Sequence, residues 1–242
     1  MKGSSTPGNR RLLATLFALA SILGLAPGCY VVDSEDIETT SIWAHFWLEQ
    51  EGDEPVIARG ELRVGGPLGS IVDLSGGEQL RVNGTRLAEW MDPITGYRWL
   101  RGIVPADPDG SYLVELVRTE EVLASAVEMP ETPLILDTFP EELVQTMDRI
   151  TLWWDTSGAE TSVDILVEGS CISTLSYQSV PDNGSFETDW VEEQNPAQPS
   201  DCPIKVSVSR GVTALVSSAF KGGYSEAHRT DSVTLGFDSY LD

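Results

Sequence analysis

Turn signals that recur between short apolar runs constrain this chain more than any other feature. Asn83-Gly84 and the segments at residues 107–110 and 182–184 combine Gly, Pro, Asn and Asp between runs of alternating hydrophobicity. These residues suit the backbone conformations of tight turns. With 41% hydrophobic residues among 242, the chain can also bury a core. The pattern therefore predicts an all-β fold of many short antiparallel strands.

The expected strands fall into two groups on either side of a proline-rich segment. Asn83-Gly84 predicts a hairpin in which Arg81 faces Arg86. Pro130, Pro133 and Pro140 mark the boundary, and residues 141–147 are consistent with one or two helical turns. The first group spans residues 42–48, 56–64, 79–87, 97–104, 111–117 and 123–129; the second spans 150–154, 162–167, 172–177, 203–209, 214–220 and 232–237.

A short internal repeat indicates two related units. Residues 108–112 (PDGSY) resemble residues 182–186 (DNGSF), about 74 positions later, and each is followed by a strand that ends in an arginine, Arg118 or Arg210. Residues 182–186 also resemble the D-x-G-x-Y corner of immunoglobulin-like domains, and residues 150–155 (ITLWWD) resemble the early tryptophan strand of fibronectin type III domains. This resemblance implies two tandem antiparallel β-sandwich domains, at residues 41–130 and 131–242.

The N-terminus has the three parts of an export signal. Lys2, Arg10 and Arg11 carry positive charge, and residues 12–25 form an apolar run of fourteen residues. That run is shorter than the roughly 20 residues of a membrane span. It suits the core of a cleaved signal peptide.

The end of this segment, residues 25–29 (LAPGC), resembles the lipobox of bacterial lipoproteins. The resemblance implies cleavage after residues 1–28 and a lipid on Cys29, which would anchor the exported chain to the cell envelope. Tyr30, where an Asp would favour retention at the inner membrane, implies the outer membrane if the host is Gram-negative. Residues 29–40 are then expected to form an acidic, solvated tether. The alternative is ordinary secretion without a lipid.

Two cysteines remain after the anchor. In an exported chain Cys171 and Cys202 predict one disulfide, which closes a loop of about 31 residues. Two free thiols are the alternative. A zinc site is not expected, since the sequence has no C-x-x-C pair and only two histidines, His45 and His228.

Charge and motif content argue against several functions. The formal net charge is −23, and removing the three positive charges of the leader gives −26 for the remainder. Such a chain repels phosphate backbones, so no nucleic-acid partner is expected. The one local Ser-His-acid grouping, Ser225, Glu226 and His228, has no G-x-S-x-G elbow before it, and we expect a polar loop there. No cofactor, metal site or catalytic residue is predicted.

The seven tryptophans offer a possible carbohydrate platform. Trp90, Trp99 and Trp190 lie near predicted turns and are the candidates for exposed rings, whereas Trp43 and Trp47 share one strand face and are expected to pack in the core. His45, between them, is expected to be a core or half-buried histidine.

The sequence therefore favours a non-enzymatic, lipid-anchored envelope protein that binds or scaffolds an envelope protein or glycan. Three alternatives stay open: a carbohydrate- or peptidoglycan-binding module, a hydrolase that uses dispersed carboxylates, and a cation-stabilised adhesion module.

Overall fold

The fold is nearly all β. The computed structural model describes residues 31–139, 142–144, 149–158, 161–189 and 203–238, and this part contains strands and two short 3₁₀ turns, Ser34–Asp36 and Thr39–Ser41. The strands are β1 Val31–Asp33, β2 Ile42–Glu51, β3 Val56–Val64, β4 Ser70–Asp73, β5 Gln79–Val82, β6 Thr85–Arg86, β7 Ala88–Met91, β8 Arg98–Val104, β9 Ser111–Val117, β10 Val122–Glu128, β11 Ile135–Phe139, β12 Glu142–Val144, β13 Thr151–Trp154, β14 Ser162–Glu168, β15 Leu175–Pro181, β16 Ser185–Glu187, β17 Ile204–Leu215 and β18 Gly222–Asp238.

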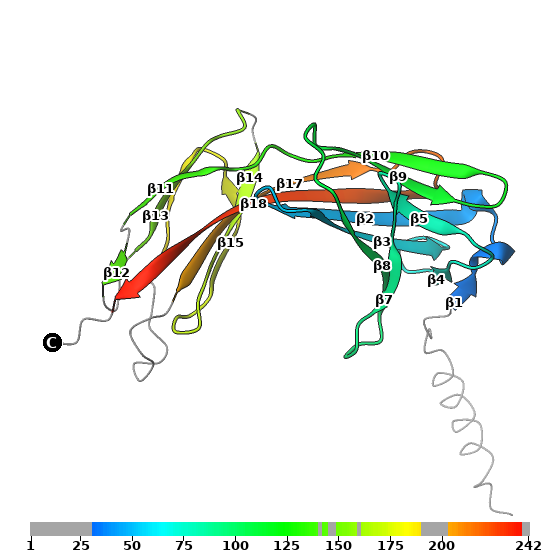
Figure 1. Cartoon of the computed structure of the whole chain (residues 1–242), viewed down its shortest axis with the longest axis horizontal. Coiled ribbons are helices and arrows are strands. Elements are labelled where there is room, and N and C mark those ends of the chain that lie inside the picture. The colour runs from blue at the N-terminus through cyan, green and yellow to red at the C-terminus, as the bar shows by residue number, and fades with distance from the viewer. Residues whose placement is uncertain (1–30, 140–141, 145–148, 159–160, 190–202, 239–242) are drawn as a thin grey trace, which may run out of the picture.

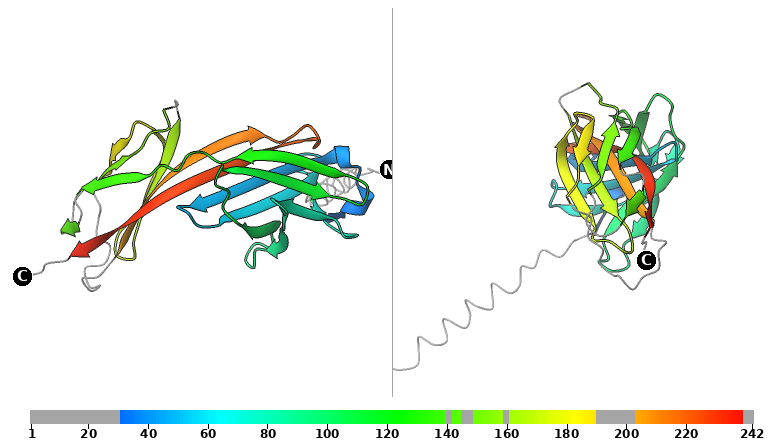
Figure 2. Two further views of the ribbon diagram at one scale, coloured as in Figure 1. Left: turned by 45° about the horizontal axis from the view of Figure 1, so that its top comes forward. Right: turned by 90° about the vertical axis from the view of Figure 1, so that its left-hand side faces the viewer.

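One long sheet runs through the molecule and two small sheets cover parts of it. The long sheet has the order β1-β4-β3-β2-β18-β17-β14-β15, with β8 and β7 branching from β3, and β12 from β18. A four-stranded sheet, β10-β9-β5-β6, encloses the first hydrophobic core, and a three-stranded sheet, β11-β13-β16, encloses the second (Figures 1 and 2). This layering confirms the predicted β-sandwich architecture.

The hairpin of β17 and β18 joins the two cores. Its antiparallel ladder runs without interruption from Ile204 opposite Leu235 to Leu215 opposite Tyr224. Val206 and Val208 lie in the second core, whereas Phe220 and Ala227 lie in the first, where β18 pairs in parallel with β2. Residues 216–227 thus contribute to the first core, although we expected all of residues 131–242 to form the second sandwich. The hairpin is visible in Figure 2 as the long orange and red pair.

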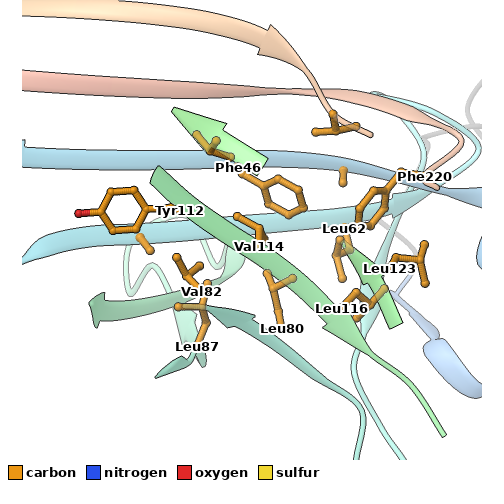
Figure 3. Close-up of a cluster of buried hydrophobic side chains, with 14 of the residues drawn as sticks. Phe46, Leu62, Leu80, Val82, Leu87, Tyr112, Val114, Leu116, Leu123 and Phe220 are labelled. Carbon is orange, nitrogen blue, oxygen red and sulfur yellow. The ribbon is translucent and has the colours of Figure 1, made fainter. Parts of the chain in front are cut away.

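The first core consists of side chains from two facing sheets, because alternate residues of each strand point towards the space between the sheets (Figure 3). Phe46 and Leu62 come from the long sheet and meet Leu80 and Val114 from the four-stranded sheet, all almost fully buried. Phe220 closes the end of the core with its ring edge-on to Phe46, at 5.7 Å between centroids. Burial of each such side chain is worth about 1.5–3 kcal/mol, so these residues fix the pairing of the two sheets.

The segment that precedes β2 belongs to the fold. β1 pairs in parallel with β4, Ser34 is fully buried, and Ile37 lies in the first core. Arg118 donates from Nη2 to the carbonyl of Ser34 at 2.7 Å. The prediction of a solvated tether was therefore wrong for residues 31–40, because Ser34, Ile37 and the pairing of β1 hold this segment against the body while its acidic side chains stay exposed.

Two other segments also differ from the sequence prediction. The backbone of Glu142–Val144 is a strand, paired in parallel with the end of β18, rather than a helical turn. Residues 222–231, expected to include a polar loop, form the first half of β18. The hairpin at Asn83-Gly84 was predicted correctly: both residues have positive φ, and Arg81 faces Arg86.

Candidate binding face of the long sheet

The long sheet presents an aromatic and charged surface on the side away from the first core. On β2, Phe46 and Leu48 face the core, whereas Trp43, His45 and Trp47 point to the opposite side. The strand registers bring side chains of the same orientation together on five neighbouring strands, β18, β2, β3, β8 and β7. We call this surface the open face; it comprises Trp43, His45, Trp47, Glu49, Arg59, Glu61, Arg63, Trp90, Tyr97, Trp99, Arg101, Tyr224, Glu226 and His228.

His45 is the centre of an aromatic row. Its imidazole lies between the rings of Trp47 and Tyr224, with centroids 3.4 Å and 3.7 Å away. Trp43 completes the row, 5.7 Å from Tyr224 in an edge-to-face arrangement. His45 is only 5% exposed, while the three larger rings are half-buried. The row therefore offers partly exposed rings that are held in place by a buried histidine.

Carboxylates flank the histidine on both sides. Nε2 of His45 is 3.1 Å from Oε1 of Glu226 on β18, and Glu61 lies directly opposite His45 on β3. Burial lowers the pKa of His45 below its usual value, against the opposing influence of Glu226 and Glu61. The imidazole is accordingly neutral at neutral pH and donates from Nε2 to the Glu226 carboxylate.

A second polar cluster connects this row to the next strand. Arg63 donates from Nη2 to the hydroxyl of Tyr97 at 2.8 Å and pairs with Glu61 through Nε. The Tyr97 hydroxyl in turn donates to Glu61. Burial and the Glu61 carboxylate raise the pKa of Tyr97, so its phenol stays protonated. Both partners of the ion pair are largely buried, which makes this cluster a rigid support for the neighbouring rings.

Trp90 and Trp99 form a stacked pair beyond Tyr97. They face each other across β7 and β8, with ring centroids 4.5 Å apart and planes 19° from parallel. Tyr97 lies 5.5 Å from Trp99 and links the pair to the polar cluster. Both tryptophans are half-buried, so two of the three rings proposed from the sequence do lie together at the surface.

The other residues proposed from the sequence have different positions. Trp190, Cys202 and Cys29 lie outside the described residues, and Cys171 is buried in the second core. Trp43 and Trp47, which we expected in the core, lie on the open face. Residues on both faces of β2 are apolar, so the alternation of hydrophobic residues did not show which face is buried. The position of His45 on the same side as the two tryptophans was the available clue.

The open face does not resemble a hydrolase centre. Ser225 points to the core side of β18 and is 1% exposed, whereas Glu226 and His228 point to the open face, so the three cannot act together. In the described ranges no three His, Cys, Asp or Glu side chains are grouped as metal ligands. No helix among these residues has the length and apolarity that crossing a membrane requires.

No protein-family model matches the chain, and no curated protein matches it. Among solved structures it is similar to the FN1–FN3 domains of chicken CNTN1, with 12% identity, a TM-score of 0.25, and coverage of 78% of this chain and 66% of that chain. The chain thus spans just under two thirds of that structure. The β-sandwich architecture described above rests on the strand pairing and the two cores.

Proposed function

We propose that this protein is an exported, lipid-anchored envelope protein that acts as a binding module without catalysis, and that the open face holds its ligand. It would be built from two tandem immunoglobulin-like sandwiches that share the β17–β18 hairpin. The observation that carries the proposal is the set of half-buried rings supported by buried ion pairs on an outer sheet face. Aromatic side chains with little freedom to move give large contact area at low entropic cost.

A glycan is the ligand class that this face favours. Trp90 and Trp99 present a stacked pair, and the row of Trp43, Trp47 and Tyr224 lies across the polar cluster from it. Flat rings complement the apolar faces of sugar rings, while Arg59 and Glu49, paired at 2.8 Å and partly exposed, can bond to hydroxyls. Rings on both sides of a polar strip suit an extended saccharide or peptidoglycan strand.

The anchor would place this face close to the membrane. The described fold begins at Val31, two residues after Cys29, and two residues span at most about 7 Å. A lipid on Cys29 would therefore hold the β1 end of the first core at the bilayer. The end of β18 lies at the opposite end of the molecule and would project outward (Figure 1).

Binding to purified peptidoglycan and to a glycan array tests the ligand proposal. Trp90→Ala, Trp47→Ala and their combination should reduce retention at least tenfold, because each removes one stacking surface. Trp153→Ala is the matched control, since Trp153 is 37% exposed on β13, away from the open face. Equal retention of the combined variant and the control would refute the open face as the site.

Membrane fractionation tests the anchor separately. Wild-type protein should sediment with membranes and be released only by detergent, whereas Cys29→Ser should be soluble after washing without detergent. If Cys29→Ser stays membrane-bound, lipidation at Cys29 is not the means of attachment. The glycan result does not depend on this outcome.

A further inference from the structure

A cavity lies where β3 changes its neighbour in the long sheet. β8 pairs with β3 as far as Gly60 opposite Leu100, and β4 pairs with it from Arg63 opposite Ile71. Glu61 and Leu62 lie between these two paired stretches of β3, and neither β8 nor β4 pairs with them. The gap opens into a cavity of about 130 Å³ that reaches the edge of the first core.

Two buried polar atoms of the cavity lining have no hydrogen-bond partner within the described part of the chain. They are Nε1 of Trp99 and Oε2 of Glu78. Glu78 is 7% exposed, and its other oxygen is bound by Arg118 at 2.8 Å. Leaving a buried donor or acceptor unpaired is unfavourable, so these two atoms indicate a ligand that supplies both a donor and an acceptor.

The remainder of the lining is apolar, and charged residues surround it. Leu62, Leu87 and Leu100 line the cavity. Arg98 lies at the rim between β4 and β7, 3.1 Å from Glu89 and 3.9 Å from Asp73, with its side chain 40% exposed. Exposed ion pairs of this kind contribute little to stability and can open at small cost. The cavity is thus a small apolar chamber with one donor, one acceptor and a displaceable charged rim.

We infer that this cavity binds a single hydroxylated six-membered ring. A hydroxyl group can donate to Glu78 and accept from Trp99 at once, and a ring of about six carbons suits the volume, since an engineered cavity of about 150 Å³ accepts benzene. A fully hydroxylated sugar would leave several hydroxyls unpaired against the leucines. The ring is therefore a phenol or a saturated cyclic alcohol with a single hydroxyl. The cavity shares Glu61 and Trp99 with the open face, but neither Trp47 nor Trp90 lines it, so the glycan test and this one can be told apart.

Ligand-detected NMR and calorimetry on the mature chain test this inference. The probes are phenol and cyclohexanol, which represent the two sources, with benzene and glucose as controls. At least one hydroxylated ring should bind at least tenfold more tightly than both controls. Glu78→Gln, which retains an acceptor for Arg118, and Trp99→Phe should each weaken binding about tenfold, the equivalent of one net hydrogen bond.

Leu74→Phe supplies the second test, because Leu74 lines the cavity and a larger side chain would fill it. This variant should abolish binding while the circular dichroism spectrum and melting cooperativity stay as in wild type. Leu134→Phe, at an exposed leucine outside the cavity, is the control. Equal binding of benzene, no binding of any probe, or full binding by Leu74→Phe would each overturn the inference.

Discussion

The two cores of this protein are stabilised by different means. In the described residues, 21 buried hydrophobic side chains form the first core and 13 form the second. The first core contains no cysteine and is closed by aromatic rings such as Phe46 and Phe220. The second is smaller and includes Cys171, and a fully buried ion pair lies beside it. A smaller core supplies less hydrophobic stabilisation, so its polar links matter more.

The two arginines at the ends of the internal repeat show the difference most clearly. Arg118 pairs with Glu78 at 2.8 Å and bonds to Ser34 and Thr39, so it ties the N-terminal segment to the first core. Its side chain is 10% exposed. Arg118 directly follows β9, whereas Arg210 lies within β17, so the two arginines do not occupy equivalent places in the fold. The carboxylate that pairs with Arg118 comes from the turn before β5.

Arg210 occupies a more enclosed site. It binds both oxygens of Asp182, at 2.8 and 3.2 Å, and the carbonyls of Glu131 and Asp155, with 2% of the side chain exposed. Burial alone would raise the pKa of Asp182, but hydrogen bonds from Arg210, Trp154 and Thr161 lower it well below its ordinary value. The carboxylate is therefore charged at neutral pH and needs its partner.

Arg210→Leu should be the most damaging single change. It leaves the Asp182 carboxylate buried without its cation, and breaking a buried pair in this way costs about 3–5 kcal/mol. Urea denaturation followed by tryptophan fluorescence measures the loss. The double variant Arg210→Leu/Asp182→Leu removes both charges and should recover part of it. A loss below about 1 kcal/mol in the single variant would contradict the role given to this pair.

Removal of the predicted Cys171–Cys202 disulfide should have the second-largest effect on stability. β14 pairs with β17 as far as Glu168 opposite Lys205, three residues before Cys171. Replacing both cysteines by alanine should cost about 3 kcal/mol. Peptide mapping without reductant should find the linked peptides; two free thiols would show the prediction to be wrong.

Arg118→Leu should have a smaller and more local effect. It leaves Glu78 unpaired and releases Ser34 and Thr39, a loss of about 1–3 kcal/mol. Hydrogen exchange should accelerate in residues 31–41 and little in the second core. Arg81→Leu is the control, because Arg81 bonds to Gln79 on its own strand. Uniform acceleration across both cores would show that Arg118 does not act locally.

Sequence patterns anticipated the strands and turns because these depend on neighbouring residues. Asn83-Gly84 adopts positive φ in any context, and its hairpin was predicted in register. Residues 31–40 were predicted to be solvated because Arg118, which bonds to Ser34 and Thr39, is distant in sequence. The tryptophans of β2 were wrongly assigned to the core, since Phe46 and Leu48 alternate with equally apolar neighbours. The pairing of β2 with β18, which is distant in sequence, determines which face of β2 is open and which residues join it in the candidate site.

Glu51 provides the smallest test of how the two cores are joined. At the end of β2 it accepts hydrogen bonds from Lys205 at 2.6 Å and Ser232 at 2.7 Å, both on the β17–β18 hairpin. The bond from Lys205, with that from Ser232, lowers the pKa of Glu51 below its usual value. Its stabilising contribution is therefore present above about pH 4.5 and is lost as the pH falls through the lower, folded-state value. Half of the Glu51 side chain is exposed, so Glu51→Gln should cost less than about 1 kcal/mol at pH 7, and the cost should decrease as the pH is lowered below 4.5. If the continuous hairpin ladder joins the cores, urea unfolding of this variant stays a single transition. Separate transitions for the two cores would show instead that this surface contact couples them.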